Sequence, residues 1–261
     1  MWYWLLPVAV LLYRRFRKPA ANEVADPARN VFISNLTVVV ASIVYIIPLE
    51  LLVGFPVSNL MFTMVLASTL MGSGSSIMAN YGAPQLPDAG GWRKGYKMKF
   101  QAAAQWLAVV ADKSPDFSYV FLCAVFLPAA PNLLVVMIIF RRSVLSCNAF
   151  AAKNMPENRI YVRIKPMYDK HVKPREAQWK HVCNVLEIVL GFQLIVGILL
   201  PSRQILTTVV YWHFLKLRFS MQRSHADALA AWKAVEERAG PVPRFIPAFI
   251  MNRIKGWFSR G

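Results

Sequence analysis

Three long apolar blocks, each interrupted near its middle by turn-forming residues, limit what this chain can fold into. They cover residues 31–78, 117–150 and 184–223. Only 16% of the 261 residues are charged and 56% are hydrophobic, whereas about 25% of a soluble domain is charged. Apolar runs of about 20 residues are typical of membrane-crossing helices. The sequence therefore predicts an all-α integral membrane protein, with three helical hairpins plus surface amphipathic helices.

Turn signals divide each block into two arms. They are Gly54-Phe55-Pro56, Pro128-Ala-Ala-Pro131-Asn132 and Pro201-Ser202. The first block opens with Val31–Val53, about 23 residues, which is long enough to cross a bilayer. The second block has arms of about 11 and 18 residues, and the third opens with about 17, near the lower limit for a crossing. The first hairpin is predicted to span, while the other two fit either a crossing or a shallow insertion.

The positive charge lies between the blocks. Of the 30 Lys and Arg residues, 5 lie in 1–30, 5 in 79–116, 10 in 141–183 and 9 in 216–261, with Arg203 alone at a turn. Three hairpins place all but Arg203 on one side, which the positive-inside tendency makes cytosolic. A single crossing by 117–140 would instead put the ten-cation loop opposite the loop 79–116. We therefore expect both termini in the cytosol.

The domain organisation follows from these blocks. Residues 1–30 form an N-terminal apolar and basic segment with a linker, and 31–223 form the membrane domain with basic cytosolic loops. Residues 224–261 form cytosolic amphipathic helices. Residues 1–13 fit a shallow anchor. Lys165-Pro166 and Lys173-Pro174 argue against one continuous helix in the loop before the third block.

Several stretches indicate surface helices. Residues 96–110 alternate apolar and polar positions with a helical period, and Ser224-His-Ala-Asp227 resembles an N-cap for a helix to Arg238. Arg244–Phe258 is basic on one face and apolar on the other, which is typical of helices in anionic membrane surfaces; packing on the protein itself is the alternative. The residues predicted to bind the membrane surface and its lipids are Lys216, Arg218, Arg223, Arg244, Phe249, Arg253, Lys255 and Trp257.

Polar residues inside the blocks are few. Glu50 and Glu187 are the acids there. An intramembrane carboxylate suggests an ion or proton site, but Glu187 can also reach water or pair with Lys180 near the interface. The histidines and cysteines show no metal-ligand or nucleophile spacing. We therefore predict no enzyme activity, no catalytic, cofactor or metal site, and no nucleic-acid partner.

The aromatic segment of the third hairpin carries a family resemblance. Tyr211-Trp-His-Phe-Leu-Lys-Leu-Arg-Phe-Ser-Met-Gln-Arg223, read here as an interfacial belt of aromatics and cations, resembles a motif of the transmembrane protein 33 family, also called Krüppel homolog 2. Cys183-Asn184 and Glu187-Ile188 are similar to the start of the same hairpin in that family. The motif positions are Tyr211, Phe214, Leu215, Leu217, Arg218, Ser220 and Arg223.

The resemblance implies a function. Members of this family include a pore-membrane protein associated with nuclear pores. The resemblance implies a non-enzymatic protein of the endoplasmic reticulum and nuclear envelope, with reticulon-type proteins or nucleoporins as partners. It also implies a C-terminal helix that binds curved membrane. One-sided hairpins independently favour curved, anionic bilayers, and a protein that shapes them is expected to form homo-oligomers. Two alternatives are an accessory subunit of a membrane complex and a small ion- or proton-coupled transporter.

Overall fold

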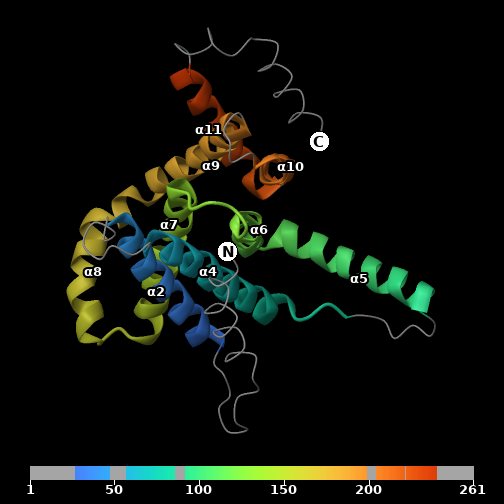
Figure 1. Ribbon diagram of the computed structural model, residues 1–261. Helices are drawn as coiled ribbons and strands as arrows, with labels where there is room; N and C mark the ends of the chain where they lie inside the picture. Colours follow the sequence, from blue (N-terminus) through green and yellow to red (C-terminus); the bar gives the residue numbers. More distant parts are fainter. Residues whose placement is uncertain (1–26, 48–56, 86–91, 199–203, 221, 240–261) are drawn as a thin grey trace.

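A computed structural model describes residues 27–47, 57–85, 92–198, 204–220 and 222–239, and their regular structure is entirely helical (Figure 1). The predicted all-α class is confirmed. The elements are α2 (Pro27–Ile46), α4 (Val57–Tyr81), α5 (Trp92–Lys113), α6 (Pro115–Phe126), α7 (Leu133–Asn154), α8 (Arg159–His171), the short 3-10 helix η1 (Lys173–Arg175), α9 (Glu176–Ile198), α10 (Ile205–Ser220) and α11 (Gln222–Ala239).

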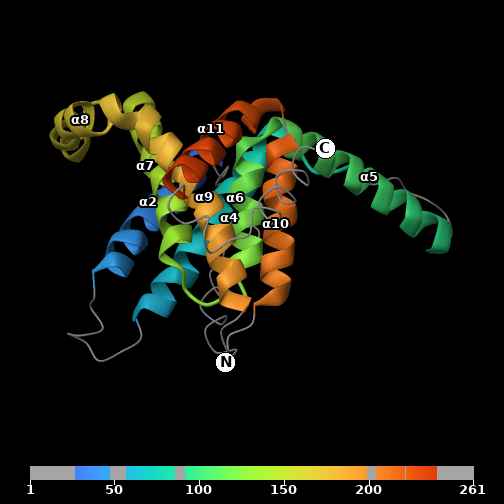
Figure 2. The same ribbon diagram turned by 90° about the horizontal axis from the view of Figure 1, so that it is seen from above.

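The helices α2 and α4, α6 and α7, and α9 and α10 follow one another as three hairpins within one bundle, in which α6 packs mainly against α4 and α7 packs against α2 and α9. Figure 2 shows that the α6–α7 connection, the end of α2 and start of α4, and the end of α9 and start of α10 lie at one end of the bundle. The helices α5, α8 and α11, which follow or join the hairpins, lie at the other end. We call this second end, to which α5, α8 and α11 belong, the open end.

The hairpin arms differ in length. The helices α2, α4 and α7 are long and apolar enough to cross a membrane, as is the run Arg159–Ile198, whose apolar part is α9. In contrast, α6 has 12 residues and α10 has 16. At 1.5 Å per residue they reach about 18 Å and about 24 Å, less than the roughly 30 Å hydrocarbon core. The second and third hairpins thus each combine one long arm with one short arm.

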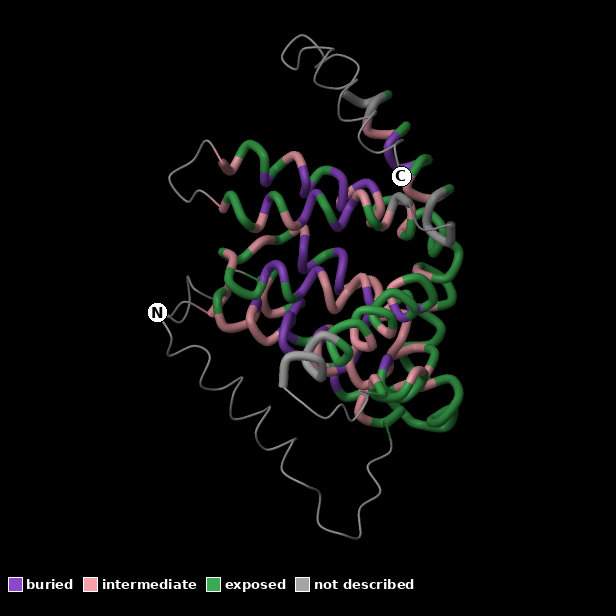
Figure 3. Tube along the Cα trace, turned by 90° about the vertical axis from the view of Figure 1, so that its right-hand side faces the viewer, coloured by how far each residue is buried: buried purple, intermediate pink, exposed green. Residues whose placement is uncertain are grey.

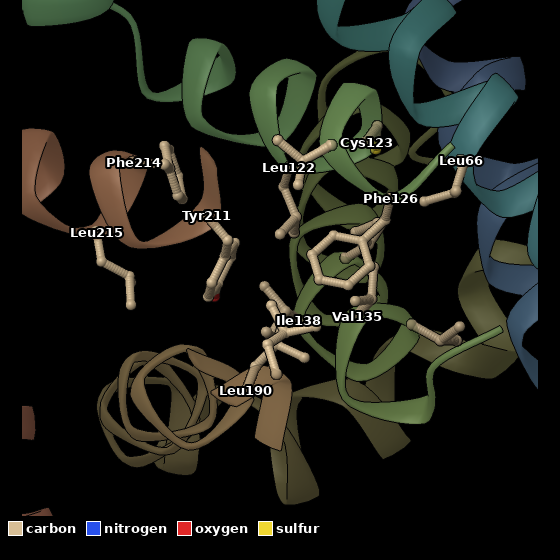
Figure 4. Close-up of a cluster of buried hydrophobic side chains, with 14 of the residues drawn as sticks. Leu66, Leu122, Cys123, Phe126, Val135, Ile138, Leu190, Tyr211, Phe214 and Leu215 are labelled. Carbon is tan, nitrogen blue, oxygen red and sulfur yellow. The ribbon is translucent and has the colours of Figure 1, made fainter. Parts of the chain in front are cut away.

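Side chains from all three hairpins meet in a common core (Figure 4). Phe126 packs edge-on against Tyr211, with ring centroids 5.6 Å apart. Figure 3 shows the buried residues along the inner faces of the bundle, while the outer faces are exposed. Those outer faces carry large apolar side chains, including Ile33, Leu36, Val40 and Ile43 of α2. An apolar exterior is what a helix bundle presents to lipid.

Small and polar residues bring α2 against its neighbours. A Cβ added at Gly72 would lie 3.0 Å from the Ser34 Cβ, so glycine permits the close contact between α2 and α4. Gly74, two residues further along α4, has no neighbour within 4 Å. On the other side of α2, the Asn35 amide donates to the Ser146 hydroxyl of α7 at 3.1 Å. Both contacts fix the first hairpin on the bundle.

The loop before α9 contains more helix than its sequence indicates. Pro166 lies inside α8 instead of marking a break. Proline removes one backbone hydrogen bond, and at this exposed position water can satisfy the freed carbonyl. The second signal, Lys173-Pro174, does interrupt the helix, because η1 occupies this position. The loop is thus not one continuous helix, as predicted, although Pro166 has no part in the interruption.

The helix α11 begins at Gln222, two residues before Ser224, so the predicted N-cap at Ser224 is wrong. Asp227 lies inside the helix and pairs with Lys180 of α9 at 2.7 Å, so the acid that suggested a cap fixes α11 to α9. Several predicted features lie outside the described residues: residues 1–13, Glu50, the helix 244–258, and the surface residues Arg244, Phe249, Arg253, Lys255 and Trp257.

Candidate functional site

The motif in α10 lies on the helix face that packs against α9 and α6. The Tyr211 hydroxyl donates to the Glu187 carbonyl oxygen at 2.9 Å, and the Trp212 indole N–H donates to the Gly191 carbonyl oxygen at 3.1 Å. Phe214 stacks on Phe121 of α6, with centroids 4.9 Å apart. Both Tyr211 and Trp212 are buried. Their interpretation as a surface belt is therefore wrong, because their polar atoms find partners on the α9 backbone.

Gly191 makes this close packing possible. A Cβ added at Gly191 would lie 2.9 Å from the Leu215 Cδ1 and 3.3 Å from the Trp212 Cζ2. No larger side chain fits there unless α10 moves away. The motif thus joins the two arms of the third hairpin through hydrogen bonds and a glycine contact.

Arg218 continues the same face one turn further along α10. Its guanidinium forms an ion pair with the Glu187 carboxylate and lies 3.4 Å from the Asn184 Oδ1. The two charged side chains are 21% and 6% exposed. The structure thus turns Arg218 toward Glu187, which differs from the predicted contact with lipid phosphates. Glu187 pairs with Arg218 and not with Lys180, whose partner is Asp227.

A second ion pair lies at the same end of the bundle. Asp116, in the first turn of α6, pairs with Arg142 of α7. Ser114 caps α6 by accepting a hydrogen bond from the Asp116 N–H. The Arg142 guanidinium also lies over the Tyr119 ring, 4.6 Å from its centroid. The pair therefore links the arms of the second hairpin as Arg218 and Glu187 link those of the third.

The pairs Arg218–Glu187 and Lys180–Asp227 line a cavity of about 260 Å³ near the open end, and Tyr119, which lies beneath the Arg142 guanidinium, lines it as well. Its lining mixes acids, cations and small polar groups from the α5–α6 junction and from α7, α9, α10 and α11: Ala111, Asp112, Ser114, Pro115, Ser118, Tyr119, Arg141, Lys180, Cys183, Asn184, Glu187, Arg218 and Asp227. The Nε of Arg141 is buried there without a hydrogen-bond partner in the described part of the chain. We call this cavity, the two ion pairs that line it and the neighbouring Asp116–Arg142 pair the polar cluster.

The chemistry of the polar cluster is that of paired charges. Glu187 has Arg218, Asp227 has Lys180, and Asp116 has Arg142. No group of three His, Cys, Asp or Glu side chains could hold a metal ion within the described ranges. The cluster joins the second hairpin, the third hairpin and α11, so its visible role is to fix the open end of the bundle.

The remaining motif residues lie around this face. Leu217 is exposed on the outside of α10. Lys216 is partly buried in the same helix. Ser220 is the last residue of α10 and Arg223 lies in the first turn of α11. The side chains of Ser220 and Arg223 are not described. Sequence reasoning missed Asp116, Arg141 and Arg142 as parts of the cluster. An available signal was that Asp116 and Arg142 lie at matching ends of two antiparallel arms.

Three hairpins with apolar outer faces and charges paired at one end define a multi-pass helical membrane protein. A family model described as Transmembrane protein 33/Nucleoporin POM33 matches residues 96–256. The matched region is more than half of the chain and runs from within α5 through α11, so the chain belongs to this family, as the α10 motif suggested. No curated protein and no solved structure matches it.

Proposed function

We propose that this protein shapes or senses curved membrane in the endoplasmic reticulum and nuclear envelope. It acts there as a non-enzymatic organiser of membrane and nuclear pores, through lipid contacts and recruited partners such as reticulon-type proteins or nucleoporins. The proposed role at nuclear pores rests on the family description, which names a nucleoporin. The membrane part rests on the geometry of the hairpins.

The observation that carries the proposal is the one-ended arrangement of the bundle. The helix ends that flank the turn of each hairpin lie at one end, and α5, α8 and α11 lie at the other (Figure 2). A helix that lies in the membrane surface adds area to the leaflet that holds it. The short arms α6 and α10 also begin or end at the open end and stop short of a full crossing. The protein thus occupies more area in one leaflet, which favours curvature toward the other.

The distribution of Lys and Arg residues supports an orientation in which the open end faces the cytosol. The segment 141–183, which runs from within α7 through α8 into the first turns of α9, carries ten Lys and Arg residues. Cytosolic loops carry such an excess, and the cytosolic leaflet is anionic. The open end therefore faces the cytosol in this proposal, with both termini on that side.

One observation favours the accessory-subunit alternative. The outer face of α2 presents apolar side chains at helical spacing, which a helix of another protein can cover as well as lipid can. Glu187 suggested an ion or proton site, but it is paired with Arg218 and so does not support the transporter alternative. A subunit would co-purify with its complex in fixed stoichiometry, whereas a curvature protein acts in pure lipid.

The test uses purified full-length protein in vesicles. Vesicle diameters are measured by electron cryomicroscopy at increasing protein density. The proposal predicts that the diameters fall or that tubules form as density rises. Unchanged diameters at every density would contradict the proposed membrane shaping. A curvature-sorting assay on tethered vesicles then tests sensing, for which enrichment on the smallest vesicles is expected.

A further inference from the structure

The helix α8 carries an apolar face that the described structure leaves uncovered. Ile160, Ile164 and Met167 follow the spacing i, i+4, i+7, which places them on one side of a helix. Their exposed fractions are 69%, 54% and 66%. No residue of α8 is buried. This region is rich in cations and contains two prolines, from which we predicted a basic loop without one continuous helix. The exposed apolar surface therefore becomes visible only in the folded chain.

The position of α8 suits a surface helix. It lies at the open end and runs across the long axes of the hairpin helices, as Figures 1 and 2 show together. One flank lies toward α7, because the half-buried Tyr168 side chain lies close to Asn148 of α7. Asn158 caps the N-terminus of α8 by accepting from the Ile160 N–H at 2.9 Å. The first contact places α8 beside α7 and the second fixes the start of α8, while its apolar face stays exposed.

The positive charge of α8 indicates which kind of surface can cover its apolar face. Residues 159–175 contain six Lys and Arg residues and one acid, Asp169. Arg163 and Lys170 border the apolar face on the flank away from Tyr168. An apolar stripe bordered by cations is the pattern of helices that lie in anionic bilayer surfaces. A protein partner that covered this helix would have to present both an apolar groove and acidic groups.

We propose that α8 is a lipid-binding helix that lies in the cytosolic leaflet. It inserts Ile160, Ile164 and Met167 between anionic headgroups. The basic residues beside them contact lipid phosphates and attract the helix to the anionic surface. This inference deepens the proposed function and rests on its orientation of the open end. It adds a leaflet-expanding element separate from the predicted C-terminal helix.

The test places a fluorescent probe on α8 in the full-length protein. Ile164→Cys carries the environment-sensitive dye NBD, in a background in which Cys123, Cys147 and Cys183 are replaced by alanine. The matched control is Lys165→Cys, the next residue, on the opposite flank. Both proteins are placed in phosphatidylcholine vesicles with and without phosphatidylserine, and the rate of NBD bleaching by external dithionite is measured.

We expect phosphatidylserine to slow bleaching several-fold at position 164 and to leave position 165 fast. Equal, fast bleaching at both positions would overturn the proposal, because α8 would then lie in water. Slow bleaching at position 164 that does not depend on phosphatidylserine would also overturn it, because a protein segment or a second copy would then cover the face.

A second variant separates insertion from folding. Met167→Glu, combined with the probe at position 164, should restore fast bleaching while the helical content by circular dichroism stays unchanged. Retained protection in this variant would contradict insertion of the apolar face. The outcome is independent of vesicle diameter. Protection without any change in diameter would refute membrane shaping and leave α8 as a lipid-binding helix.

Discussion

Arg218 and Lys180 form ion pairs of different kinds within one cluster. The pair of Arg218 with Glu187 is largely buried between α9 and α10, with exposed fractions of 21% and 6%. The pair of Lys180 with Asp227 is open to water, with exposed fractions of 53% and 41%. Removing one partner of a buried pair leaves an uncompensated charge, whereas an exposed pair contributes little.

We therefore predict that Arg218→Met lowers the free energy of unfolding by about 3 kcal/mol. Denaturant titration of the purified protein in mixed micelles measures this change. The control Lys180→Met, which removes an exposed cation, should cost less than about 1 kcal/mol. In the double variant Glu187→Leu/Arg218→Met, much of the stability should return, because no charge is left buried. Equal losses in the two single variants would contradict the structural role assigned to Arg218.

At the scale of elements, the contact between α2 and α4 depends on Gly72. The neighbouring Gly74 lies in the same helix but has open space around it. Leucine at either position gains about 1 kcal/mol of helix propensity over glycine. Only leucine at position 72 meets Ser34, and overpacking of this kind costs about 2 kcal/mol.

We therefore predict that Gly72→Leu is less stable than Gly74→Leu by about 2 kcal/mol. The same denaturant titration measures the difference. If the two variants were equally stable, the α2–α4 contact would not be as close as the structure shows. Loss of this packing should also weaken the Asn35 hydrogen bond to Ser146, since both contacts position α2.

The elements also show which features were readable from the sequence. The hairpins were predictable, because long apolar runs and proline-rich turns report directly on the bilayer and on chain reversal. The inward orientation of Tyr211 and Trp212 was not predictable from the sequence. Aromatics beside cations occur both at membrane surfaces and in helix contacts, and the distinction depends on acceptors in α9 some 20 residues away. The exposure of the α8 face required the folded bundle.

At the scale of the whole molecule, the central claim is that every hairpin enters from and returns to one side. The ends of α7 test it most directly. Its first turn follows the connection that contains Ala130, and its last turn contains Lys153 at the open end. The family match contains the second and third hairpins, so their orientation bears on the family as well as on this chain.

The measurement is thiol labelling of single-cysteine variants in sealed microsomes, in a background without the native cysteines. The positions are Ser58, Ala130 and Gln204 beside the hairpin connections, and Lys153 and Lys170 at the open end. We predict that Lys153→Cys and Lys170→Cys react with a membrane-impermeant reagent in intact microsomes, while the other three variants react only after detergent is added. Protection of Lys153→Cys together with labelling of Ala130→Cys would contradict the one-sided arrangement and remove the basis for the proposed membrane shaping.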